Sequence, residues 1–151
     1  VRVAPRVIDA WIDADGKETP QDRPEVVRVI SEATAKTLTE MLIGVTQEGG
    51  TAESASINGY LVAGKTGTTE ILSDDSTVAS FVGFLPARDP VLAIAVIVNR
   101  PEGIYGGTVA APVFREVALA AMQALNIAPD PSVVAAQAAR NGAGGERDAN
   151  Q

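Results

Sequence analysis

The sequence contains no cysteine and no histidine. Without thiols the chain can form no disulfide and can offer no thiolate to a metal ion. Without imidazole it can build neither a Ser-His-Asp triad nor a cysteine-histidine dyad, and most zinc chemistry is excluded as well. If the chain takes part in acyl transfer, lysine is therefore the side chain that serves as the base.

Positive charge is scarce. The chain has 12 lysines and arginines against 19 aspartates and glutamates, which gives a formal net charge of −7 at pH 7. Nucleic acids and anionic lipid headgroups are bound by clustered lysine and arginine side chains. We therefore expect no nucleic-acid partner.

Long apolar runs are also missing, and the sequence starts at Val1 without a signal peptide. A transmembrane helix needs about 20 predominantly apolar residues. We expect a segment of a longer protein, any membrane anchor of which lies outside these residues. With 151 residues and 46% hydrophobic content, the chain is nevertheless able to bury a core.

Strands are predicted near the start and in the middle of the chain. The Asp15-Gly16 turn between residues 6–12 and 17–19 indicates a short hairpin. One further strand is expected to follow the Asn58-Gly59 turn and to end at the Lys65 segment. After a polar loop over residues 70–77, two more strands are expected over residues 78–85 and 91–98. Because short links join these strands, we expect them to be antiparallel. The unbroken apolar run of residues 92–98 is typical of a strand covered on both faces.

Two long helices are predicted. The first starts at Pro24 and ends at Gly49-Gly50. Its apolar side chains recur at steps of three and four and are expected to pack in the core: Val27, Ile30, Thr34, Leu38, Met41 and Val45. The second starts at Pro112, with an expected buried face of Val113, Val117, Ala120 and Ala124. From residue 128 onward we expect a disordered tail, with at most one frayed turn over residues 133–139.

Four consecutive residues carry the chemistry: Lys65, Thr66, Gly67 and Thr68. The lysine ammonium attracts an anion and the threonine hydroxyls can donate to it. Gly67 lacks the side chain that would keep a peptide-like ligand away from the strand backbone. An ammonium facing a carboxylate in a partly dry cleft contributes roughly 1.5–3 kcal/mol. The segment is thus predicted to hold an acyl substrate by its carboxylate.

A Lys-Thr-Gly triplet is one of the marks of serine β-lactamases and penicillin-binding proteins. In this chain it is flanked, in order, by four further blocks: residues 48–52, 79–87, 92–98 and 105–114. In this order and spacing, residues 1–127 resemble the C-terminal part of the transpeptidase domain of class B penicillin-binding proteins, in particular the cell-division or septal type. The resemblance implies an α+β fold, with an antiparallel sheet flanked by helices, and leaves residues 128–151 as the tail.

The resemblance also implies roles for single residues. Lys65 polarises the site and draws in the carboxylate of a stem peptide or of a β-lactam, and the hydroxyls of Thr66 and Thr68 bind that carboxylate. The backbone N–H of Thr68 forms half of an oxyanion hole, and Gly67 leaves the strand edge open to the backbone of an extended substrate. Tyr105 contributes an aromatic wall, although family members often carry two adjacent aromatics where this chain has Ile104 and Tyr105.

The nucleophile of this family is missing from the chain. No serine is followed three positions later by lysine, so both the acylated serine and its general-base lysine are absent. Ser56, Ile57 and Asn58 spell a Ser-x-Asn element but stand a few residues before Lys65, and we interpret them as part of the Asn58-Gly59 turn. We expect the nucleophile to lie upstream in the same domain and the isolated chain to be inactive.

The resemblance implies a peptidoglycan D,D-transpeptidase that cross-links D-Ala-D-Ala stem peptides through a serine acyl-enzyme, without a cofactor or metal. β-Lactam antibiotics would acylate it. It would work on the outer face of the bacterial cytoplasmic membrane, with cell-division membrane proteins as partners. Two alternatives stay open: a β-lactamase or D,D-carboxypeptidase of the same superfamily, and a non-catalytic domain that senses penicillin or only binds.

Overall fold

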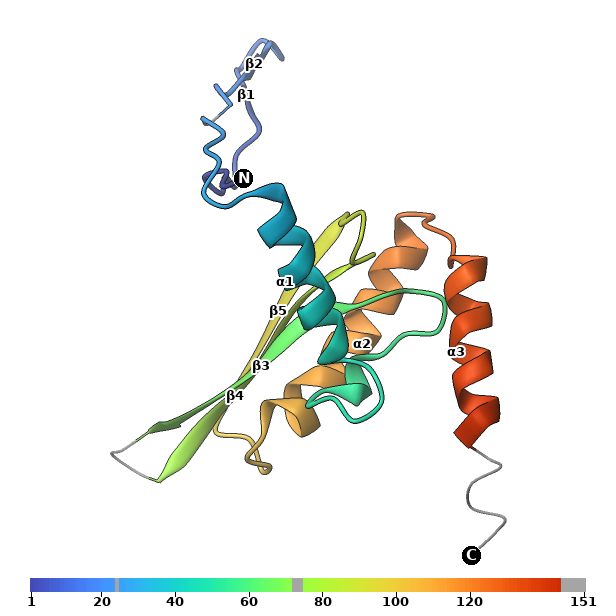
Figure 1. Ribbon diagram of the computed structural model, residues 1–151. Helices are drawn as coiled ribbons and strands as arrows, with labels where there is room; N and C mark the ends of the chain where they lie inside the picture. The colour runs from blue at the N-terminus through green and yellow to red at the C-terminus, as the bar shows by residue number, and fades with distance from the viewer. Residues whose placement is uncertain (24, 72–74, 145–151) are drawn as a thin grey trace, which may run out of the picture. The chain divides into compact units, whose positions relative to one another are not determined.

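The computed structural model describes residues 1–23, 25–71 and 75–144 of the chain (Figure 1). The chain divides into two compact units, Val1–Lys36 and Thr37–Gln151. The first unit contains a two-stranded sheet, and the second contains a three-stranded sheet and most of the helical residues.

The first unit carries the hairpin that was predicted around Asp15-Gly16. Strands β1 (Ala10–Ile12) and β2 (Glu18–Pro20) pair antiparallel, each only three residues long. Gly16 adopts φ +80°, which favours glycine, and the Asp13 carboxylate accepts hydrogen bonds from two backbone amides of the turn. The hairpin prediction is therefore confirmed.

Helix α1 (Glu32–Gly44) begins later and ends earlier than predicted. Ser31 caps it, because the Ser31 hydroxyl accepts a hydrogen bond from the Thr34 amide at 3.0 Å. Residues 25–30, before the cap, are not helical, and Val27 pairs with Arg2 in an isolated bridge, so the predicted start at Pro24 is wrong; Pro24 itself lies outside the described residues. The chain leaves the helix at Gly44, ahead of the predicted end at Gly49-Gly50.

The apolar stripe predicted for this helix is not its buried face. Leu38 is 47% exposed and Met41 is 66% exposed, whereas Ile43 is buried. Ile43 packs with Ala63 and Ala87 against the sheet of the second unit. The prediction of this buried stripe was wrong because the helix is short and only its last turn lies on that sheet.

The larger sheet is antiparallel, as predicted, in the order β3-β4-β5. Its strands are β3 (Ala63–Ile71), β4 (Ser76–Leu85) and β5 (Leu92–Asn99). The polar loop predicted over residues 70–77 is wrong at both ends, because Glu70 pairs with Thr77 and Ile71 with Ser76; residues 72–74 lie outside the described residues. β3 thus stands at one edge of the sheet as the structure describes it.

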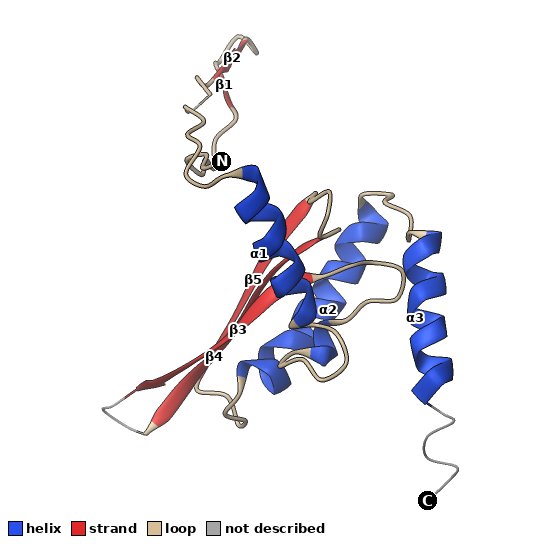
Figure 2. Ribbon diagram, viewed as in Figure 1, coloured by secondary structure: helices blue, strands red, loops and turns tan. Residues whose placement is uncertain are grey.

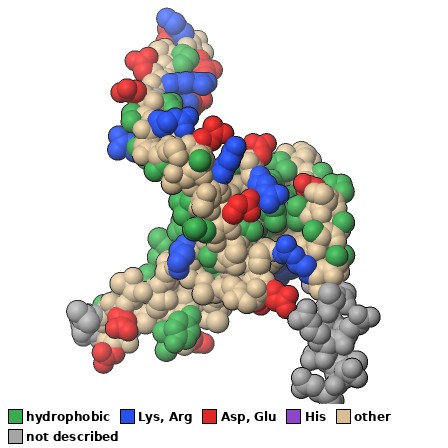
Figure 3. All heavy atoms as spheres, viewed as in Figure 1, with side chains coloured by type: hydrophobic (Ala, Val, Ile, Leu, Met, Phe, Trp, Pro, Cys, Tyr) green, Lys and Arg blue, Asp and Glu red, His purple; other side chains and the backbone are tan. Residues whose placement is uncertain are grey.

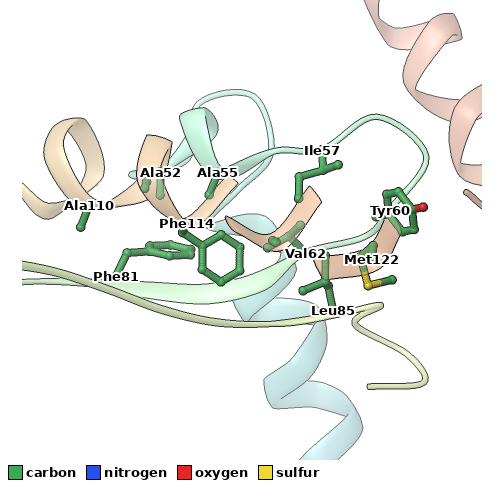
Figure 4. Packing of buried hydrophobic residues seen from close by; sticks show 12 residues of the cluster. Ala52, Ala55, Ile57, Tyr60, Val62, Phe81, Leu85, Ala110, Phe114 and Met122 are labelled. Carbon is green, nitrogen blue, oxygen red and sulfur yellow. The ribbon is translucent and has the colours of Figure 1, made fainter. Parts of the chain in front are cut away.

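The short 3₁₀ helix η1 (Glu53–Ala55) packs against helix α2 (Gly106–Ala124), and α2 covers one face of this sheet (Figure 2). The core between them is closed by Phe81 of β4 and Phe114 of α2, which meet edge to face (Figure 4). Alanines on α2 allow the helix to lie close to the strands. The buried residues of the helix are Gly106, Ala110, Ala111, Phe114, Ala118 and Met122.

This pattern corrects the face predicted for α2. Val113 is 46% exposed and Val117 is 48% exposed, and Ala120 and Ala124 are exposed as well. The helix also starts six residues before Pro112, which lies inside it. The helix presents its single large aromatic and its small residues to the sheet, because valines in their place would hold the helix backbone farther from the strands.

The opposite face of the sheet is covered only in part. On β5, Leu92, Ile94, Val96 and Val98 pack against the core on the α2 side, but Ile97 on the other face is 69% exposed. The prediction that residues 92–98 are covered on both faces is therefore wrong for the part of the chain described. Val82 of β4, on the same outer face, is 52% exposed.

Helix α3 (Pro131–Gly144) follows α2, and it contradicts the predicted disorder over its length. It is held by the turn before β3. The Gly59 amide donates to the Gln137 side-chain oxygen at 2.8 Å, and the Gln137 side-chain amide donates to the Ile57 carbonyl at 3.2 Å. An alanine-rich helix of this kind is stable because it docks through such contacts. The end of the predicted tail, residues 145–151, lies outside the described residues.

Candidate active site

The Lys65 segment lies in the middle of β3 rather than at the end of a strand, because β3 continues to Ile71. Lys65, Thr66, Gly67 and Thr68 pair in register with residues 82, 81, 80 and 79 of β4. The other edge of β3 pairs with no strand among the residues described. Pairing with β4 therefore fixes the extended backbone of these four residues, and the other edge of β3 stays open to a ligand.

Side chains alternate between the two faces of this strand. Thr66 lies opposite Phe81, whose ring packs on α2, so Thr66 and Thr68 project on the α2 face. Lys65 lies opposite Val82, which is half exposed on the outer face. The lysine and the threonines therefore start from opposite faces of one edge strand.

The Lys65 ammonium nevertheless reaches Thr66. Its Nζ donates to the Thr66 carbonyl oxygen at 3.0 Å and to the Thr66 hydroxyl at 3.2 Å, and the lysine side chain is exposed. A cation and a hydroxyl therefore meet at the edge of β3, where a ligand carboxylate can contact both.

The start of α2 lies against the same strand. The Gly106 amide donates to the Thr68 hydroxyl at 3.3 Å. Tyr105, the residue before Gly106, is 67% exposed and occupies the position that precedes the helix. The structure thus places the backbone of Tyr105 next to the contact between α2 and β3, about forty positions along the chain from the lysine segment.

Two hydroxyl residues at this contact were not singled out from the sequence. The Thr51 hydroxyl lies 3.5 Å from the Thr66 hydroxyl, and the Ser54 hydroxyl donates to the Gly107 carbonyl at 2.7 Å. Both precede the strand in a loop and η1. Thr51 belongs to the block of residues 48–52 that was noted in the sequence, but no local pattern distinguishes these side chains from ordinary loop residues.

The Ser-x-Asn letters at residues 56–58 belong to a turn, as predicted. Ile57 and Tyr60 form an isolated bridge around Asn58 and Gly59, and Gly59 adopts φ +81°. A surface hollow of about 230 Å³ opens beside this turn, lined by Gln47, Glu48, Ser56, Asn58, Gln137 and Arg140. Ser56 and Asn58 therefore face α3 residues rather than Lys65.

The groups with displaced pKa values lie at other places in the second unit. A hydrogen bond to the Glu40 carboxylate raises the pKa of Arg88, and hydrogen bonds from Ser132 lower the pKa of Asp130. On the face drawn in Figure 3, lysines and arginines are scattered among aspartates and glutamates. These charges are spread along several elements and do not form a second candidate site.

Neither a metal centre nor a membrane span was found where the chain is described. Across residues 1–23, 25–71 and 75–144, no three carboxylate side chains are grouped so that they could hold a metal ion. Within the same ranges no helix is long and apolar enough to cross a bilayer.

Comparison with known proteins gave consistent matches. The family model described as the penicillin binding protein transpeptidase domain matches residues 1–119. Penicillin-binding protein PbpB of Mycolicibacterium smegmatis is 38% identical over 149 residues, covering 87% of this chain and 23% of the relative. The probable peptidoglycan D,D-transpeptidase PenA of Neisseria flavescens is 39% identical over 113 residues, covering 70% of this chain and 28% of the relative.

A solved structure agrees with these matches. The D,D-transpeptidase domain of a peptidoglycan glycosyltransferase from Eggerthella lenta superposes with a TM-score of 0.68 at 29% identity, covering 80% of this chain and 27% of that one. The chain therefore spans about a quarter of the length of the proteins it matches. The family model ends before α3, which begins at Pro131.

Proposed function

Because this chain belongs to the penicillin-binding protein transpeptidase family, we propose that it is part of a peptidoglycan D,D-transpeptidase and supplies the strand that binds the substrate. The observation that carries this proposal is the convergence at one edge of β3. The Lys65 ammonium and the Thr66 hydroxyl meet there, and the Thr68 hydroxyl meets the start of α2. The edge of β3 offers backbone groups to an extended peptide.

In this function Lys65 attracts the terminal carboxylate of a D-Ala-D-Ala stem peptide, and the hydroxyls of Thr66 and Thr68 donate hydrogen bonds to it. Gly67 has no side chain that could keep the peptide backbone away from the unpaired edge of β3. An added Cβ at this position would also come within 2.6 Å of Ser80 Oγ on the neighbouring strand. Tyr105, exposed beside the start of α2, forms an aromatic wall next to the bound peptide.

The chemistry is acyl transfer. A serine oxygen attacks the carbonyl carbon between the two D-alanines, and the carbonyl oxygen becomes an oxyanion that the Thr68 N–H stabilises. The C–N bond breaks and D-alanine leaves with a proton. An amine of a neighbouring stem peptide then attacks the acyl-enzyme, which forms the cross-link and releases the serine. β-Lactams acylate the same serine because they resemble the D-Ala-D-Ala end.

The serine and its base lysine are supplied by the part of the relatives' length that this chain does not span. No Ser-x-x-Lys stands in the sequence, so the isolated chain is inactive. The outer face of the sheet supports this assignment, because Val82, which lies opposite Lys65, and Ile97 of β5 expose apolar surface that the rest of the domain would cover. The whole protein works on the outer side of the bacterial cytoplasmic membrane, with cell-division membrane proteins as partners.

Labelling with a fluorescent penicillin tests the proposal. The intact parent protein and the 151-residue chain are incubated with the probe and run side by side on a denaturing gel. We expect covalent label on the parent and none on the chain. Absence of label on both would overturn the transpeptidase assignment and favour the non-catalytic domain.

Turnover separates the transpeptidase from a hydrolase of the same superfamily. A β-lactamase hydrolyses its acyl-enzyme quickly, whereas a transpeptidase remains acylated by the β-lactam for a long time. The parent protein is therefore expected to consume about one equivalent of a chromogenic β-lactam in a burst. Rapid multiple turnover would make the hydrolase the correct assignment.

A further inference from the structure

We propose that Ser54 and Gly106 are positioning residues for this site, which hold the start of α2 against β3 so that the Thr68 hydroxyl is aimed at the ligand carboxylate. The inference rests on the proposed function and assigns residues outside the lysine segment. Three observations support it: the Gly106 amide donates to the Thr68 hydroxyl, no room is left for a side chain at position 106, and Ser54 holds the first turn of α2.

The donor at this contact is settled by its chemistry. A backbone amide can only donate, so at 3.3 Å the Thr68 oxygen is the acceptor of the Gly106 N–H. The single hydroxyl proton of Thr68 must then point away from Gly106. A donor is thereby left for a ligand, and donation from the first amide of a 19-residue helix polarises the hydroxyl in the direction that favours an anionic acceptor.

The same contact serves the helix. Tyr105, at the capping position of α2, makes no capping hydrogen bond through its side chain. The first amides of a helix need acceptors from outside it. Thr68 supplies one of these from β3, which ties the threonine rotamer to the position of the helix.

Glycine is required where the helix meets the strands. A Cβ at position 106 would come within 2.6 Å of the Gly67 carbonyl oxygen and nearer still to the Ser80 carbonyl oxygen. Both neighbours are backbone atoms of paired strands and cannot give way easily. Position 106 has an ordinary helical backbone, so the glycine is explained by close approach and not by a left-handed φ.

An anchor on the other side keeps the helix in this place. The Ser54 hydroxyl donates to the Gly107 carbonyl at 2.7 Å, across 53 positions of sequence. A Cβ at Gly107 would collide with the Thr51 carbonyl oxygen, so this second glycine also lies directly on the loop. The start of α2 is therefore held between the residue 51–54 loop and β3.

The test uses the full-length parent protein and two probes, a fluorescent penicillin with its free carboxylate and the methyl ester of the same molecule. The acylation rate is measured for Gly106→Ala, Ser54→Ala and Thr68→Val, and for each of the first two combined with Thr68→Val. Gly44→Ala is the control, because an added Cβ at the end of α1 meets nothing within 4 Å.

We expect Gly106→Ala to slow acylation by the free acid roughly tenfold and Ser54→Ala about threefold, the scale of a misdirected hydrogen bond. Neither change should slow acylation by the ester, which lacks the anion, and neither should add to the loss caused by Thr68→Val. Gly44→Ala should label as the wild type does.

Equal losses with both probes, or losses that add to Thr68→Val, would overturn the inference, because they would show a general effect on the fold. If melting shows that Gly106→Ala does not fold, Ser54→Ala decides, since it removes only one exposed hydroxyl, and an unchanged rate in that variant overturns the proposal. A wild-type parent that takes no label would instead refute the proposed function itself.

Discussion

Phe114 of α2 meets Phe81 of β4 edge to face, with ring centroids 4.8 Å apart and an angle of 72° between the rings. Both side chains are fully buried. Room for them comes from two glycines, since a Cβ at Gly83 would approach Phe114 to 2.9 Å and a Cβ at Gly64 would strike the Phe81 ring. This pair joins α2 to the strand that lies next to the Lys65 segment.

Phe114→Ala should therefore destabilise the protein by about 3–5 kcal/mol, through lost burial and the cavity left behind. Urea unfolding followed by circular dichroism measures the change. Val117→Ala is the control on the same helix, because Val117 is 48% exposed, and it should cost less than about 1 kcal/mol. Equal costs for the two variants would show that α2 does not pack through Phe114.

Gln137 is expected to be the residue that holds α3 to the turn before β3. Its side chain bonds both the Gly59 amide and the Ile57 carbonyl. Gln137→Ala leaves these partly buried backbone groups without their partner, which should cost roughly 1–3 kcal/mol and raise hydrogen exchange at Gly59. Gln123→Ala, at an exposed position of α2, is the control and should change neither quantity. Unchanged exchange at Gly59 in Gln137→Ala would contradict the docking.

Asp130 should make the stability of α3 depend on pH. Hydrogen bonds from Ser132 lower the pKa of this carboxyl from its ordinary value of 3.8. A lowered folded-state pKa means that the stabilisation is complete above 3.8 and disappears as the pH falls through the lower folded value. Asp130→Asn should thus melt below the wild type near neutral pH, and the gap should close as the pH drops below 3.8.

Melting curves for the two proteins across this range give the answer. Asp89→Asn, an exposed change in the loop after β4, serves as the control for the loss of one negative charge. A gap between Asp130→Asn and the wild type that stays constant down to the lowest pH would mean that the ionised carboxylate of Asp130 does not cap α3.

The sheet could be predicted from the sequence because its signals are local. Short links force antiparallel neighbours, and the run from Leu92 to Val98 can only be a strand or a buried helix. The hairpin at Asp15-Gly16 follows from one turn dipeptide. Burial was harder to predict than strand pairing, because Ile97 and Leu38 are large apolar residues of the kind found in cores and yet are exposed in this chain.

The predicted helix bounds were wrong where contacts between distant parts of the sequence outweigh the local conformational preference of the residues. Gly106-Gly107 suggests a loop, since glycine is a poor helix former, but the first turn of α2 needs glycine to lie against Thr51 and the strands. The composition of residues 131–144 suggests disorder, but Gln137 of α3 bonds the Gly59 amide, 78 positions away along the chain, and the Asp130 amide donates to the Gly59 carbonyl. Neither contact leaves a signal in its own stretch of sequence.

The site itself divides in the same way. Lys65, Thr66, Gly67 and Thr68 stand together in the sequence, so their adjacency needed no structure. Ser54 could not have been found, because its partner at Gly107 is 53 positions away. The roles of the four residues in catalysis remain predictions. The role that mutation tests most directly is that of the Thr68 backbone amide.

Thr68→Pro removes the N–H that the mechanism assigns to the oxyanion, and it removes the hydroxyl as well. Loss of one oxyanion donor slows acyl transfer about 10²–10³-fold, so labelling of the full-length parent by penicillin should fall by at least that factor. Thr68→Val keeps the N–H and loses only the hydroxyl, and Thr68→Ser keeps both, so the expected order of rates is Ser, then Val, then Pro. Proline is tolerated on edge strands, and a melting curve verifies that the variant folds. A folded Thr68→Pro protein that labels as fast as Thr68→Val would show that the oxyanion is stabilised elsewhere, because the two variants then differ in an N–H that the reaction does not use.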